Sequence, residues 1–218
     1  MDIKQGAESA DSDAVVLNDV IVTGRENQTL TNRQFVNSCI YLAIYEADKR
    51  YNSDRQPSEW FDRFVGTFWS TGWGLEDEPV DIVMPQFSGS VQRIWKESAG
   101  RLLTHSQTVQ VDAAMASIEK DALLLKKFVS LEGRIYKSQI VPMRSNSLGG
   151  LEIVLSQIRL LKSVFSPTFL FWQIHQPMSQ LDLRARKLVI KRRDIEASQA
   201  VVEKAIREIP YKLEEYPI

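Results

Sequence analysis

The chain has 218 residues, 44% of them hydrophobic and 25% charged, which is an ordinary composition for a globular protein of one good-sized domain. Its formal net charge of −1 argues against a dedicated nucleic-acid binder, because such proteins are usually basic. The single cysteine, Cys39, excludes an internal disulfide framework and a cysteine-rich zinc site.

No run of 18 apolar residues occurs, so no segment is predicted to cross a membrane as a single helix. Residues 1–13 lack the basic region and the apolar region of a secretory signal. We therefore expect a soluble protein that is cytoplasmic at synthesis, and we leave open an export route without a signal peptide.

The first 30 residues are acidic, with six acidic and two basic side chains and a net charge of −4. Within them, residues 14–23 are rich in β-branched side chains, which predicts one strand or two short strands that turn at Asn18-Asp19. We interpret residues 1–30 as an N-terminal arm and residues 31–218 as a single α+β domain. A strand-forming arm is expected to dock, either on its own domain or on a neighbouring chain. The strand residues predicted to make this contact are Val20, Ile21 and Val22.

Apolar residues spaced three and four apart predict about five helices. A short strand is predicted at residues 80–84, after an acidic trio, Glu76-Asp77-Glu78, that we interpret as a solvated loop. The predicted helices span residues 31–51, 58–71, 90–103, 109–130 and 194–209.

Residues 134–190 predict an antiparallel meander of about four strands, with turn residues such as Gly149-Gly150 between them. In the last strand the apolar side chains change face after Ala185, which predicts a bulge near Lys187. Helices followed by strands and a final helix indicate an α+β fold, because a doubly wound sheet would alternate the two. The predicted strands span residues 134–141, 151–158, 168–174 and 181–190.

The sequence offers little material for catalysis. Its two histidines, His105 and His175, lack the spacing of a metal site, and we interpret both as surface or loop residues. Cys39 lies on an apolar helical stripe, which favours a buried, inert thiol over catalysis or lipid attachment. Neither a phosphate-binding glycine motif nor a nucleophile elbow occurs. We therefore assign no catalytic residue, no metal site and no cofactor.

A basic run extends from the last predicted strand into the last helix. Its side chains could form a solvated strand face, a docking surface for an acidic protein segment, or a contact with nucleic acid or anionic lipid. The docking interpretation matches the acidic arm, in the same chain or in a neighbouring subunit. The basic residues are Arg184, Arg186, Lys187, Lys191, Arg192 and Arg193.

Aromatic side chains gather in the second predicted helix and just after it. Helical spacing of such residues is typical of core packing. Insertion into a membrane interface is the alternative, although the helix has no lysine-rich face. The residues expected to contact the membrane in that case are Trp60, Phe64, Phe68, Trp69 and Trp73.

These observations favour a non-catalytic binding or self-assembling protein that uses its arm and its basic strand face. The expected partner is a protein, either a second copy or another subunit. The alternative is a membrane-acting bacterial toxin or virulence effector that uses the aromatic helices. An enzyme ranks third, and nucleic acid is the least favoured partner.

Overall fold

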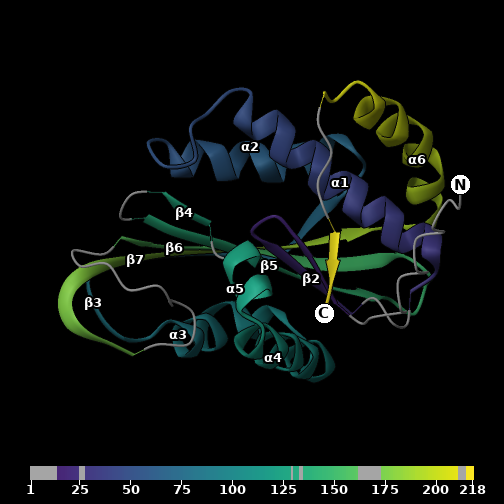
Figure 1. Cartoon of the computed structure of the whole chain (residues 1–218). Helices are drawn as coiled ribbons and strands as arrows, with labels where there is room; N and C mark the ends of the chain where they lie inside the picture. The colour runs from purple at the N-terminus through teal and green to yellow at the C-terminus, as the bar shows by residue number, and fades with distance from the viewer. Residues whose placement is uncertain (1–13, 25–27, 129, 133–134, 162–172, 211–214) are drawn as a thin grey trace, which may run out of the picture.

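The computed structural model describes residues 14–24, 28–128, 130–132, 135–161, 173–210 and 215–218. It has an α+β fold, as the sequence predicts, in which one mixed sheet lies between two layers of helices (Figure 1). One face of the sheet is covered by α1 (Leu30–Asp48), α2 (Pro57–Ser70) and α6 (Arg192–Arg207). The other face is covered by α3 (Val91–Ser98), the 3-10 helix η1 (Ala99–Leu102), α4 (His105–Lys120) and α5 (Ala122–Phe128).

The described residues form a sheet of eight strands in the order β3-β7-β6-β5-β2-β1-β8, with β4 paired to β5 outside this path. The predicted meander is present, because β5, β6 and β7 pair antiparallel in sequence order. The prediction of about four antiparallel strands is too simple, since strands from both ends of the chain join the sheet and β2 pairs parallel with β5. The strands are β1 (Val15–Leu17), β2 (Val20–Thr23), β3 (Gly74–Ser90), β4 (Ser130–Glu132), β5 (Ile135–Ser145), β6 (Leu151–Leu161), β7 (Gln173–Ile190) and β8 (Glu215–Pro217).

Several predicted elements differ in extent from the observed ones: the strand predicted at 80–84 is the middle of β3, and the helix predicted at 90–103 is α3 followed by η1. The predicted strand 168–174 lies mostly outside the described residues, and its last two residues begin β7. The predicted helix 109–130 is two helices, because Asp121 has an extended backbone with φ of −114° and ψ of 106°. The Asp121 carboxylate then accepts hydrogen bonds from the backbone N–H groups of Leu123 (2.8 Å) and Leu124 (3.1 Å), which starts α5.

Residues 14–23 form a hairpin within the sheet of the same chain. The chain turns at Asn18-Asp19, where Asn18 has a φ of 53°, a conformation that asparagine tolerates better than most residues. Strand β2 then pairs with β5, and β1 pairs with β8. Val20, Ile21 and Val22 are completely buried by this pairing and by the helices.

The sheet separates two hydrophobic cores, and β7 contributes to both. Leu181, Leu183 and Ala185 belong to the core beneath α3 and α4, whereas Leu188 and Ile190 belong to the core beneath α1, α2 and α6. The pairing of β7 with β6 is unbroken from Ile190 to Gln180, so the predicted bulge in the last strand is wrong. The apolar residues change face because different halves of the strand are covered by different helical layers.

The irregularity opposite Lys187 lies instead in β3, whose register with β7 shifts between Glu76 and Val80. Asp77 has a φ of 63° at this bulge. The acidic trio is therefore part of an edge strand, and its interpretation as a loop is wrong. Exposed acidic side chains on an edge strand reduce its pairing with other chains.

Candidate functional site

The sheet face beneath α1 and α2 is apolar at one end and polar at the other. The apolar end packs against aromatic side chains of α2. The polar end contacts residues 49–56, the connection between α1 and α2, and the start of α2. Because alternate residues of a strand share a face, neighbouring strands bring their polar residues together here. These residues are Lys137 and Gln139 of β5, Gln157 and Arg159 of β6, and Asp182 and Arg184 of β7.

Three basic side chains of this polar end hold the α1–α2 connection. The Lys137 Nζ lies 2.7 Å from the Asp54 Oδ1 and donates a hydrogen bond to the Ser53 Oγ at 2.8 Å. Arg159 donates to the Asp54 backbone carbonyl oxygen at 2.8 Å and pairs with Asp182 at 3.0 Å.

The third basic side chain is Arg184, which donates a hydrogen bond to the Ser58 hydroxyl at the start of α2. We call this set the α1–α2 clamp. It fixes the polar end of the helical layer, while apolar packing fixes the other end. The clamp residues are Lys137, Arg159 and Arg184 on the sheet, and Ser53, Asp54 and Ser58 on the helical layer.

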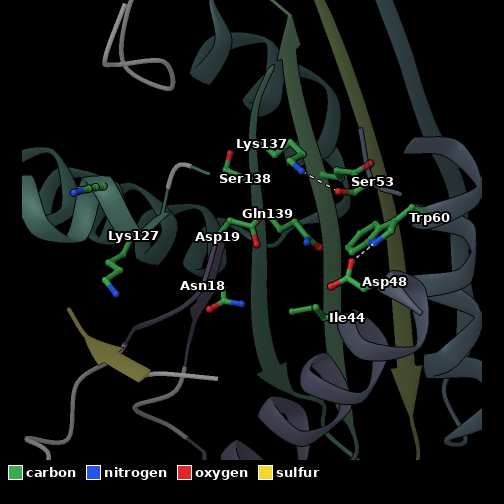
Figure 2. A pocket seen from close by; sticks show the side chains of 12 residues that line it. Asn18, Asp19, Ile44, Asp48, Ser53, Trp60, Lys127, Lys137, Ser138 and Gln139 are labelled. Atoms are coloured by element: carbon green, nitrogen blue, oxygen red, sulfur yellow. Dashed lines mark hydrogen bonds between the residues drawn. The ribbon is translucent and has the colours of Figure 1, made fainter. Parts of the chain in front are cut away.

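A pocket of about 380 Å³ lies beside the clamp, at the edge of β5 (Figure 2). Strand β4 pairs with β5 as far as Lys137, and β2 pairs with β5 from Gln139 onward. The edge of β5 is therefore open at Ser138, and side chains from both helical layers reach the pocket there. The lining residues are Asn18, Asp19, Ile44, Asp48, Ser53, Trp60, Lys126, Lys127, Lys137, Ser138, Gln139 and Gln157.

The pocket is lined by two carboxylates, Asp19 and Asp48, whose charged forms are less stable there than in water. Burial raises the pKa of Asp19 to about 6, although nearby Lys137 opposes the shift. Burial also raises the pKa of Asp48, while the Trp60 indole N–H, which donates to its Oδ1 at 2.7 Å, opposes that shift. The backbone carbonyl oxygen of Asp19 accepts a hydrogen bond from the Gln139 N–H at 2.7 Å, which fixes the hairpin turn in the pocket.

Replacing Asp19 with asparagine is expected to stabilise the protein near pH 7.5 by about 1–3 kcal/mol and to have little effect near pH 4. The pKa of Asp19 is raised from 3.8 when the protein folds, so its contribution to stability is complete below that value and is lost as the pH rises through about 6. Urea denaturation at both pH values measures the difference. Asp62→Asn, on the exposed surface of α2, is the control. Equal effects of Asp19→Asn at both pH values would contradict the burial argument.

The basic run is divided by the structure. Arg184 and Arg186 pair with Asp81 of β3 at 3.8 and 3.0 Å, and Lys187 pairs with Glu76 at 2.9 Å. The other three members lie at the start of α6 and are exposed: Lys191, Arg192 and Arg193. The sequence did not anticipate that acidic residues of β3 would meet the strand half of the run. Docking of an acidic partner on the exposed half stays a prediction.

Four of the five aromatic residues expected to meet a membrane lie in the core beneath the α1–α2 layer. Trp60, Phe64, Phe68 and Trp73 are each at most 4% exposed, and Trp60 and Phe64 stack with ring centroids 5.3 Å apart. Trp69 is 52% exposed. Lipid contact by the four buried rings therefore requires α2 to leave the sheet, whereas Trp69 is already on the surface. Their membrane role stays a prediction.

The structure also places the residues considered for catalysis. Cys39 is buried, burial raises the pKa of its thiol to about 12, and its sulfur lies 3.9 Å from the Thr71 hydroxyl. His105 begins α4, and the backbone of His175 lies in β7. Within the described part of the chain, no group of three or more His, Cys, Asp or Glu residues could hold a metal ion.

Sequence reasoning missed the pocket and the clamp. A signal was present, because Lys137 and Gln139 alternate with other residues of β5, and Gln157 and Arg159 do the same in β6. Such alternation in two paired strands predicts a polar patch on one face of a sheet. The approach of Asp19 and Asp48 to that patch has no comparable signal.

Comparisons with known proteins give a likeness in structure only. No protein-family model matches the chain, and no curated protein matches it. A solved delta-endotoxin is similar with a TM-score of 0.53 at 13% identity, and the match covers 88% of each chain. The activated Cyt2Ba monomer from Bacillus thuringiensis subsp. israelensis is similar with a TM-score of 0.51 at 11% identity, over 76% of this chain and 94% of that one. At these identities the likeness establishes a common fold: this chain has the three-layer architecture of those structures.

Proposed function

We propose that the protein is a membrane-acting protein of the toxin type, which was the alternative interpretation of its sequence. The observation that carries this proposal is the likeness to a delta-endotoxin across 88% of both chains. A second feature agrees with it: the α1–α2 layer buries a large aromatic surface that a lipid interface would accept.

In the proposed action, the α1–α2 layer would leave the sheet and bind at the lipid interface. The buried rings of α2 would be strongly unfavourable in water, but a lipid interface keeps them in apolar surroundings. None of the helices in the described segments is long and apolar enough to cross a membrane. Because aromatic side chains are suited to a lipid interface, we infer from the rings of α2 that the layer would bind there. The α1–α2 clamp must open before this exchange, because it fixes the polar end of the layer to the sheet.

We expect Trp69 to make the first contact with the membrane, because its ring is exposed while those of the other four predicted membrane-contact residues are buried. We expect Trp69→Ser to slow the release of dye from vesicles of phosphatidylcholine and phosphatidylglycerol by roughly 3- to 10-fold, the effect of losing about 1 kcal/mol of apolar contact. The measurement is calcein fluorescence against time. Leu148→Ser is a matched control, because Leu148 is 86% exposed in the β5–β6 turn and lies outside the α1–α2 layer.

Three outcomes separate the possibilities. A slower release for Trp69→Ser alone would support the proposal. Equal slowing by both substitutions would remove the special role of Trp69. If the unaltered protein neither binds nor permeabilises any lipid mixture, the proposed function is wrong.

A further inference from the structure

The charges that line the pocket are separated in space. Asp48 and Trp60 come from the α1–α2 layer, whereas Lys126 and Lys127 come from α5 on the other side of the β5 edge. Asp19 lies between these two groups, at the turn of the β1–β2 hairpin (Figure 2). The pocket therefore has an acidic end, formed by the half-buried Asp19 and the exposed Asp48 at the end of α1, and a basic end beside α5.

Lys137 lowers the pKa of both Asp19 and Asp48, but its ammonium group makes its direct contacts with the clamp. Lys137 is engaged by Asp54 and Ser53 of the clamp. The carboxylate of Asp19 has no ion pair with any described residue. A bound cation would stabilise the charged forms of both carboxylates, and most of all that of Asp19, whose pKa is raised the more.

The basic end offers two ammonium groups. Lys126 is exposed at the border of the pocket. The Lys127 Nζ lies over the ring of Tyr216, 4.7 Å from its centroid, which holds that side chain beside β8. Pairs of lysines are suited to phosphate, which they bind as compact point charges.

Ser138 adds a polar group without a hydrogen-bond partner beside the pocket, and a few other buried polar atoms elsewhere in the described structure also lack one. Ser138 lines the pocket at the open edge of β5, it is completely buried, and its hydroxyl has no hydrogen-bond partner in the described structure. Buried hydroxyl groups nearly always have one. The volume of about 380 Å³ is in the range of small-molecule sites.

We propose that this pocket binds a phosphorylated primary amine, with its ammonium group between Asp19 and Asp48 and its phosphate at Lys126 and Lys127. A primary ammonium is preferred to a quaternary one, because carboxylates bind it through N–H donors that a quaternary nitrogen lacks. The ligand is either a free molecule or the head group of a lipid. The site does not depend on the proposed membrane action, and its first test needs no membrane.

The first experiment is isothermal titration calorimetry of the full chain with phosphoethanolamine. Ethanolamine, phosphocholine and glycerol 3-phosphate are the comparison ligands, since each lacks one element of the recognition. We expect phosphoethanolamine to bind at least about 10-fold more tightly than any of the three. Equal affinity for phosphoethanolamine and glycerol 3-phosphate would overturn the ammonium end, and no binding of phosphoethanolamine would overturn the whole inference.

Variants locate the site. Asp48→Asn keeps an acceptor for the Trp60 indole and is expected to weaken phosphoethanolamine about 10-fold or more, as is the double variant Lys126→Gln/Lys127→Gln. Lys120→Gln is the matched control, because Lys120 is exposed in the last turn of α4 and does not line the pocket. Circular dichroism establishes that each variant is folded. Unchanged affinity in the folded Asp48→Asn and double-lysine variants would place the ligand elsewhere and overturn the assignment.

A second arm identifies the source of the ligand. Vesicles containing phosphatidylethanolamine are added as competitors of free phosphoethanolamine, with phosphatidylcholine vesicles as the comparison. Competition by the former alone supports a lipid head group, and competition by neither supports a free ligand. Binding of phosphoethanolamine without any dye release would contradict the proposed function and leave the pocket assignment intact.

Discussion

Replacing Lys137 with methionine is expected to lower the free energy of unfolding by about 3–5 kcal/mol. The Lys137 and Asp54 side chains are each only 11% exposed, and their charged atoms lie 2.7 Å apart. Removing the lysine takes away the ammonium group that lies 2.7 Å from the buried Asp54 carboxylate. The measurement is urea denaturation at pH 7.5, where Asp54→Asn should show a loss of the same kind.

A double-mutant cycle measures the interaction energy between Lys137 and Asp54. The variant Lys137→Met/Asp54→Asn should recover part of the stability that each single variant loses, because both buried charges of the pair are then removed together. Arg192→Met is the control: Arg192 and Glu196 also pair, but they are 75% and 67% exposed, so the expected loss is below about 1 kcal/mol. A loss that small for Lys137→Met as well would mean that water reaches Asp54.

The same substitution has an expected consequence for the proposed function. Opening the clamp frees the polar end of the α1–α2 layer without changing the apolar surface of α2. Lys137→Met should therefore release dye from vesicles faster than the unaltered protein, whereas Arg192→Met should not. A slower release by Lys137→Met would contradict the idea that the clamp restrains the layer.

Replacing Gly24 with alanine is expected to lower the free energy of unfolding by about 2–5 kcal/mol. Gly24 follows β2 with a φ of 79°, a left-handed conformation that disfavours a Cβ. A Cβ at this position would also lie 2.1 Å from the backbone carbonyl oxygen of Met143 in β5. Since a backbone atom cannot move aside as a side chain can, β2 must shift away from β5.

The control for this prediction is Gly66→Ala. Gly66 lies inside α2, and a Cβ there would meet no atom within 4 Å. Alanine restricts the unfolded chain and favours a helix, so this substitution should raise the stability by up to about 1 kcal/mol. Thermal or urea unfolding of the two variants gives the comparison. A Gly24→Ala protein as stable as the unaltered one would mean that the β2–β5 pairing tolerates the displacement.

Local patterns in the sequence were sufficient for α1, α2 and α6 and for the antiparallel pairing of β5, β6 and β7. The spacing of apolar residues predicts α1 and α2 because each helix buries one continuous stripe. The β-branched residues around Asn18-Asp19 likewise predict the β1–β2 hairpin. Each of these elements is specified by residues close to one another along the chain.

The acidic edge strand and the pocket escaped prediction because distant residues specify them. Glu76 and Asp77 occur in β3 beside Lys187, 3.1 Å or less from it, although acidic residues are depleted in strands. Asp19 reaches the pocket only because β2 pairs with β5. The sequence does show that the apolar residues of β7 change face. Whether a bulge or two separate cores causes this change depends on which helices cover each half of the strand.

The parallel pairing of β2 with β5 constrains the order in which the chain can fold. Val20 is synthesised early, yet its partner Gln139 and the β8 partner of β1 emerge much later from a ribosome. The β1–β2 hairpin must therefore wait, with an apolar surface exposed, until the meander exists. Closing so long a loop is entropically slow, so we expect the hairpin to be the last strand pair to join the sheet. During synthesis, this hairpin is the segment most in need of protection from aggregation.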